Sequence, residues 1–146
     1  MLDGVRLIDR VAQALEPQCS SLVVCGREDA LFTCIPDLPQ NDIGPLGGLF
    51  AALERGKAFG FDAVLSAPCD VPDLPVNLAQ LLEGSGAAYV EDQPVVGLWS
   101  IAASEALSTY LSQGKRSLYG FAESIQARPV ALDKPLRNIN RPEDLE

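Results

Sequence analysis

Ala63-Val64-Leu65-Ser66-Ala67-Pro68-Cys69-Asp70-Val71-Pro72 joins a short apolar run, typical of a buried strand, to an aspartate placed between two prolines. Open α/β sheets bind their ligands at the carboxyl ends of such strands, and each proline fixes the backbone beside the aspartate. Mg²⁺ is commonly held by one or two carboxylates together with substrate phosphates. Asp70 is therefore the first candidate for a catalytic residue and metal ligand, the alternative being an aspartate that only caps a turn.

Helical and strand patterns alternate on both sides of this run. The hydrophobic spacing predicts helices over residues 7–15, 46–58, 76–83, 102–112, 117–125 and 142–145. Short apolar runs predict strands over residues 21–25, 30–35, 61–67, 87–90, 94–99 and 129–132. This order favours the α/β class: a Rossmann-like, mostly parallel sheet with helices on both faces. A tight turn at residues 91–93 adds an antiparallel excursion in the second half.

Composition narrows the class of protein. With 146 residues, of which 47% are hydrophobic and 21% charged, the chain is expected to form a single domain over residues 1–146. A net charge of −9 argues against a nucleic-acid partner. The sequence has no histidine, which excludes Ser-His-Asp hydrolysis and histidine-ligated zinc. Four cysteines without C-x-x-C spacing and the lack of a long apolar run predict a cytoplasmic protein with no membrane partner.

Two further segments carry candidate binding residues. The turn Gly44-Pro45-Leu46-Gly47-Gly48 opens a predicted helix, and its small residues would let a nucleotide approach backbone amides, although it can equally be an ordinary helix entry. Asn138 and Asn140 lie two residues apart, so on an extended segment both amides point the same way. Turn and capping roles explain this asparagine pair equally well.

Together these motifs resemble the molybdenum cofactor guanylyltransferase family. The segments at 44–48, 66–72 and 138–140 occur in the family's order with Gly114-Lys115-Arg116-Ser117 and Pro142-Glu143-Asp144-Leu145, across nearly the whole chain. The resemblance implies a nucleotide-diphospho-sugar transferase type of fold and transfer of GMP from GTP to molybdopterin with Mg²⁺. It also implies the role of each site residue: metal binding and catalysis by Asp70; nucleotide binding by Asp37, Gly44, Pro45, Leu46 and Gly47; and pterin binding by Arg116, Asn138 and Asn140.

The chain also departs from the family pattern. Residues 1–9 resemble the segment that follows the family's first strand and phosphate-binding loop, so the domain is expected to be truncated at its N-terminus. Cys25-Gly26-Arg27 stands where the family usually has an asparagine near the base. Both differences weaken contacts to the nucleotide. The alternatives are therefore a catalytically inactive homologue that binds a pterin or a partner, and a nucleotidyltransferase for another acceptor.

Truncation has a structural consequence as well. In the family the first strand lies inside the sheet, so its absence would leave the edges of two flanking strands unpaired. Unpaired strand edges promote association. We therefore expect a repaired sheet, a strand exchanged with a partner, or a homodimer that covers the exposed edge.

Overall fold

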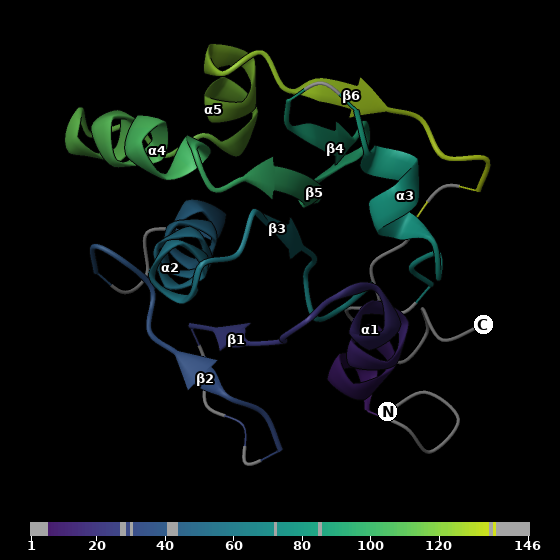
Figure 1. Ribbon diagram of the computed structural model, residues 1–146. Helices are drawn as coiled ribbons and strands as arrows, with labels where there is room; N and C mark the ends of the chain where they lie inside the picture. Colours follow the sequence, from purple (N-terminus) through teal and green to yellow (C-terminus); the bar gives the residue numbers. More distant parts are fainter. Residues whose placement is uncertain are drawn as a thin grey trace.

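The computed structural model describes residues 6–26, 29, 31–40, 44–71, 73–84, 86–134 and 136 (Figure 1). In chain order its elements are α1 (Leu7–Leu15), the 3₁₀ helix η1 (Glu16–Gln18), β1 (Val24–Cys25), β2 (Cys34–Ile35), α2 (Pro45–Phe59), β3 (Ala63–Ser66), α3 (Leu78–Leu82), β4 (Ala88–Val90), β5 (Gln93–Ser100), α4 (Ala103–Ser112), α5 (Leu118–Ser124) and β6 (Arg128–Val130). Helices and strands alternate, which confirms the α/β class.

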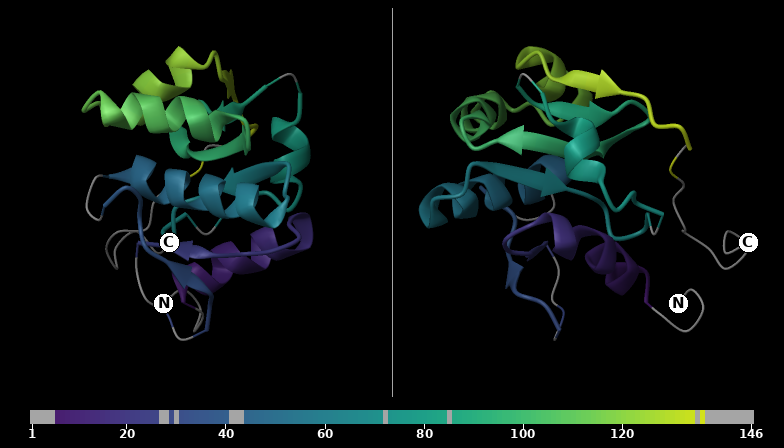
Figure 2. Two further views of the ribbon diagram at one scale, coloured as in Figure 1. Left: turned by 60° about the vertical axis from the view of Figure 1, so that its left-hand side comes forward. Right: turned by 45° about the vertical axis from the view of Figure 1, so that its right-hand side comes forward.

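Two sheets form within the described residues. β3, β5, β4 and β6 lie side by side in that order, and β1 pairs in parallel with β2 in a separate sheet. β4 pairs in parallel with β6, whereas β5 runs antiparallel to both β3 and β4. The expected antiparallel excursion is therefore β5. Figures 1 and 2 show the β1–β2 sheet and α1 on one side of β3, and α4, α5 and β6 at the opposite end.

The core divides into two clusters that cover opposite faces of the larger sheet. One joins α2, α4 and α5 to Trp99, and the other joins α1 and α3 to β4 and β5. Consecutive residues of β5 alternate between them, since Trp99 belongs to the first cluster and Val96 to the second, as the two-residue period of a strand requires. Helices thus lie on both faces, as expected.

The sequence explains most of the helices directly. In α1 the buried residues Ile8, Val11, Ala12 and Leu15 follow helical spacing and form one apolar face. α2 begins at Pro45, a residue whose fixed φ suits the first position of a helix, and Leu46, Leu49 and Leu53 lie on its buried face.

The largest buried side chain is anchored by hydrogen bonds between strands. Trp99 has no exposed surface, and its Nε1 donates to Ser66 Oγ at 2.9 Å. Ser66 Oγ in turn donates to the carbonyl oxygen of Val95 at 2.6 Å. A Cβ on Gly97 would lie 2.8 Å from the indole ring, so the glycine leaves the space that the ring fills. Trp99 is a core residue, as expected from its place in a strand-like run.

Several elements are shorter than the patterns predicted. The runs at 21–25 and 30–35 form β1 and β2, which have two residues each. They are short because each strand pairs only with the other, over two residue pairs. The helix predicted over 76–83 is α3 (Leu78–Leu82), because Pro75, Val76 and Asn77 form a turn before it. The helix predicted over 142–145 lies outside the described residues.

β3 is an end strand in the part of the chain that the structure describes. It pairs with β5 along one edge, and the β1–β2 sheet beside its other edge remains separate. The expectation of a repaired sheet is therefore wrong for these residues. In the described ranges no helix is both long and apolar enough to cross a membrane.

Candidate functional site

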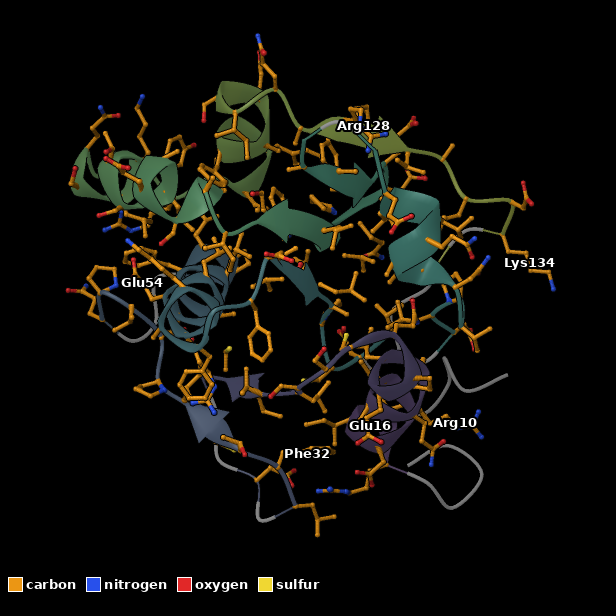
Figure 3. The ribbon with its side chains drawn as sticks, viewed as in Figure 1. Arg10, Glu16, Phe32, Glu54, Arg128 and Lys134 are labelled. Atoms are coloured by element: carbon orange, nitrogen blue, oxygen red, sulfur yellow. The ribbon has the colours of Figure 1, made fainter. Side chains whose placement is uncertain are left out.

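A cavity of about 700 Å³ lies between the two sheets. Its walls come from β1 and the segment before it, from β3 and the segments on both sides of it, and from faces of α1 and α2. Phe32, labelled in Figure 3, lines it from the turn before β2. The cavity reaches the segment before α2, and this is where the sequence places its nucleotide-binding candidates.

Asp37 lines this cavity and packs against two glycines. A Cβ on Gly26 would lie 2.8 Å from Asp37 Oδ1, and one on Gly48 would lie 3.6 Å from it. Gly26 has a φ of +75°, a conformation that disfavours any other residue. The backbone N–H of Leu38 donates to the carbonyl oxygen of Gly47 at 3.2 Å, which ties the Asp37 segment to the start of α2. The structure therefore places Asp37 next to the glycine turn.

The glycine turn itself divides between cavity and core. Gly44 and Pro45 line the cavity, and Gly44 precedes α2 with a φ of +85°. Leu46 has no exposed surface and Gly47 is buried, so these two face the core. Gly48, at the end of the turn, lines the cavity as well, so the middle of the predicted nucleotide-binding turn is closed to a ligand and its two ends are open.

Cys25 lies at the end of β1, and the pKa of its thiol depends on the burial and the charges of this region. The pKa of its thiol is raised to about 11, first by burial and next by the negative charge of Asp37, while Arg55 of α2 acts to lower it. The thiol is therefore neutral at pH 7 and is no nucleophile. Arg55 also lies over the Phe59 ring, 4.4 Å from its centroid, and it is the one cationic side chain among the described residues that line the cavity.

Asp70 lies in the turn that follows β3 and is half-buried. Pro68 and Cys69 immediately before it line the cavity, but Asp70 is not among the lining residues. No group of three or more potential metal ligands occurs within the described ranges. A single carboxylate suits Mg²⁺ only when substrate phosphates and water complete the coordination, which is its common mode with nucleotides.

Arg116, the one residue predicted for the pterin that the structure describes, does not line this cavity. Arg116 is exposed between α4 and α5, where its Nη1 donates to the carbonyl oxygen of Leu111 at 3.1 Å, near the end of α4. Arg128, labelled in Figure 3, likewise donates to the carbonyl oxygen of Leu82 at the end of α3, at 3.1 Å. Both cations thus satisfy helix C-termini. Asn138 and Asn140 lie outside the described residues.

Sequence reasoning missed Gly26 and Arg55 as parts of the site. A glycine directly after a strand-like run is the signal that could have identified Gly26, because such positions often need a positive φ. Nothing in the local pattern distinguishes Arg55 from an ordinary helix-surface cation.

An α/β sheet with a cavity at strand ends and at the start of a helix defines a nucleotidyltransferase type of domain, and solved structures share this fold. Molybdopterin-guanine dinucleotide biosynthesis protein A from Archaeoglobus fulgidus matches with a TM-score of 0.77 at 23% identity, covering 99% of this chain and 84% of that one. 2-C-methyl-D-erythritol 4-phosphate cytidylyltransferase from Thermus thermophilus matches with a TM-score of 0.74 at 14% identity, covering 99% and 88%. At these identities the likeness shows the fold alone.

Sequence comparison identifies the family. Residues 1–128 match the family model of the MobA-like NTP transferase domain. The molybdenum cofactor guanylyltransferase of Cereibacter sphaeroides is 34% identical over 157 aligned residues, covering 99% of this chain and 81% of that protein. That of Yersinia pestis is 33% identical over 162, covering 99% and 82%. The chain belongs to the molybdenum cofactor guanylyltransferase family of MobA-like NTP transferases, as the resemblance in its motifs implied.

Proposed function

We propose that the protein is a transferase of molybdenum cofactor biosynthesis that moves GMP from GTP to molybdopterin. The carrying observation is the half-buried Asp37 carboxylate, which packs against Gly26 and Gly48 at a cavity beside the start of α2. A carboxylate accepts hydrogen bonds from the N–H groups of guanine. Backbone N–H groups at a helix start suit an anionic substrate. The chain's membership of the molybdenum cofactor guanylyltransferase family supports the same reaction.

The proposal assigns a role to each side of the site. Asp37 with Gly44 and Pro45 faces the nucleotide; Leu46 and Gly47 support that turn from the core. Asp70 would hold Mg²⁺, which supplies positive charge to the triphosphate and to the leaving pyrophosphate. The pterin would be bound by Arg116, Asn138 and Asn140, and the proposed location is the cytoplasm, with neither nucleic acid nor membrane as a partner.

Nucleotide binding tests the role of Asp37. By calorimetry with Mg²⁺, Asp37→Asn should weaken GTP binding by roughly ten- to a hundredfold, as expected for losing charge-assisted hydrogen bonds. The affinity for CTP should change little. Asp62→Asn is the matched control, because Asp62 is another carboxylate that lines the cavity. Equal losses in both variants, or tighter binding of CTP than GTP by the unmodified protein, would contradict the proposal.

Metal removal tests the role of Asp70. EDTA should weaken GTP binding to the unmodified protein and have little further effect on Asp70→Asn, because that variant has already lost its metal ligand. Asp73→Asn, three residues further along and exposed, should keep the full response to EDTA. An Asp70→Asn protein that responds to EDTA like the unmodified one would remove Asp70 from the metal site.

Thermal protection tests the pterin side. Molybdopterin should raise the melting temperature of the unmodified protein, and Asn140→Ala and Arg116→Ala should reduce that rise. Lys115→Ala removes a neighbouring cation that lies over the Tyr110 ring and serves as the control. A pterin that protects none of these proteins would contradict the assignment.

The open sheet edge also bears on assembly. We propose that the chain by itself forms a homodimer that covers this edge at high concentration, because unpaired strand edges favour association. Light scattering over a concentration series should show a monomer that converts to a dimer. A strictly monomeric chain at the highest concentration would refute this part of the proposal.

A further inference from the structure

Tyr119, the second residue of α5, has an aromatic ring that stays open to solvent. Its side chain belongs to a residue that is 52% exposed, whereas Phe121, two residues further along the helix, has no exposed surface. Tyr119 belongs to neither core cluster and does not line the cavity between the sheets. An exposed aromatic ring can stack on a flat heterocyclic ligand, provided that the protein holds the ring in place.

Two contacts hold the Tyr119 ring in place. It meets the Tyr89 ring nearly at right angles, with 6.1 Å between the ring centroids and 80° between the planes. Its hydroxyl donates to the carbonyl oxygen of Glu91 at 3.2 Å. Tyr89 itself packs against the core cluster that contains residues of α2, α4 and α5. A ligand that binds to the Tyr119 ring would therefore lose little affinity to the ordering of this side chain.

The hydroxyl contact places the ring at the edge of the sheet to which Asp70 belongs. Glu91 follows the carboxyl end of β4, and Asp70 lies in the turn after the carboxyl end of β3. β3 and β4 both run antiparallel to β5, so their carboxyl ends share one edge. Both strands also pair with Gly97 of β5, which separates them by two strand spacings, roughly 10 Å. A single small molecule can span this distance.

A cation lies close to Tyr119 in the chain. Arg116 precedes it by three residues, in the turn before α5. Among the described residues only Nη1 of its guanidinium finds acceptors, the carbonyl oxygens of Leu111 at 3.1 Å and Lys115 at 2.8 Å. In this part of the chain Nε and Nη2 thus remain available to an anionic group. The two side chains together offer a ring for a flat heterocycle and a charge for an anion attached to it.

We propose that Tyr119 stacks on the pterin ring of molybdopterin and positions this acceptor beside Asp70. The inference rests on the proposed function and adds a binding residue to it. Molybdopterin joins a flat pterin to a phosphate, which is the combination that Tyr119 and Arg116 suit. Figures 1 and 2 show α5 and the β1–β2 sheet on opposite sides of β3. The acceptor and the nucleotide, which Asp37 would bind, thus approach the end of β3 from opposite sides.

Titration with molybdopterin, followed by the pterin absorption band, tests the stacking. Tyr119→Leu keeps an apolar side chain but removes the ring, so it should weaken binding about five- to fiftyfold and abolish the fall in absorbance that accompanies stacking. Tyr119→Phe keeps the ring and loses only the hydrogen bond to Glu91, so its affinity should stay within roughly threefold of that of the unmodified protein. Phe59→Leu removes a ring of a residue that is 59% exposed on α2 and should leave molybdopterin binding unchanged.

GTP binding separates this role from the proposed function. Tyr119→Leu should bind GTP as tightly as the unmodified protein, because Tyr119 does not line the cavity that contains Asp37. A parallel loss of GTP binding would mean that the substitution damages the fold, and would overturn a role confined to the pterin.

Two further outcomes would overturn the stacking role while leaving the transfer of GMP in place. One is equal molybdopterin affinity in Tyr119→Leu and Phe59→Leu, and the other is an equal loss in Tyr119→Leu and Tyr119→Phe. If the unmodified protein binds no molybdopterin, the proposed acceptor is wrong and the stacking role is overturned with it.

Discussion

At the scale of single residues, Gly26 makes a clear prediction. Its φ of +75° and the 2.8 Å between a built Cβ and Asp37 Oδ1 mean that Gly26→Ala both strains the backbone and displaces the carboxylate. Gly114→Ala is the matched control, because Gly114 has a φ of +81° with nothing within 4 Å. Both variants should lose about 1–2 kcal/mol of unfolding free energy, measured by urea denaturation. Only Gly26→Ala should also weaken GTP binding, and an equal affinity in the two would contradict the role given to Asp37.

Cys25 offers a second residue-scale prediction. Its thiol pKa of about 11 lies above the ordinary value because of burial and the Asp37 charge, so thiolate, the reactive form, is scarce at pH 8. Iodoacetamide labelling followed by mass spectrometry should show Cys25 reacting slowly at pH 8 and faster as the pH rises toward 11. Asp37→Asn removes a negative charge and lowers the thiol pKa, so labelling at pH 8 should accelerate. An unchanged labelling rate in Asp37→Asn would mean that Asp37 lies too far from Cys25 to affect its thiol pKa.

The same pKa predicts a pH dependence of stability. Because the folded-state pKa is raised, the neutral thiol stabilises the fold fully below the unfolded value of 9.0, and this contribution is lost as the pH rises from about 9 to about 11. Cys25→Ser should therefore flatten the fall in unfolding free energy over this window. A profile identical to that of the unmodified protein would contradict this reading of Cys25.

Sequence patterns predicted Asp37 and Gly44 as site residues, but the contacts of Asp37 with Gly26 and Gly48 could not be predicted. Those contacts join segments that are separate in the chain, and a local pattern contains no information on the distance between them. Leu46 illustrates the same limit, because a motif position that matches the family can still face the core.

At the scale of elements, the pairing of β3 with β5 depends on the Ser66–Trp99 hydrogen bond. Ser66→Ala leaves the buried indole N–H without its acceptor, which should cost about 1–3 kcal/mol of unfolding free energy. Ser112→Ala, on the exposed end of α4, also loses a hydroxyl that donates to a carbonyl and should change stability by less than ~0.5 kcal/mol. Urea denaturation, monitored by tryptophan fluorescence, measures the unfolding free energy of both variants. Equal losses would contradict a stabilising role for the Ser66–Trp99 hydrogen bond.

Elements with strong periodicity were predicted well, and weakly paired ones were not. α2 was predicted within a residue at each end, because its apolar face and the proline at its start are local signals. β1 and β2 were predicted too long, because strand length depends on the partner strand and not on the apolar run alone. The register of β5 between β3 and β4 is likewise set by tertiary contacts.

At the scale of the whole molecule, alternating helices and strands predicted the α/β class, while the separation of the two sheets emerges only from the structure. The candidate nucleotide-binding residues lie beside the space between these sheets. Asp37, Gly44 and Pro45 line the same cavity as β1 and β3. Gly26 directly follows β1, so the pairing of β1 with β2 also positions the glycine against which Asp37 packs. The site therefore depends on contacts between segments that are far apart in the chain, which is why it could be assembled only from the structure.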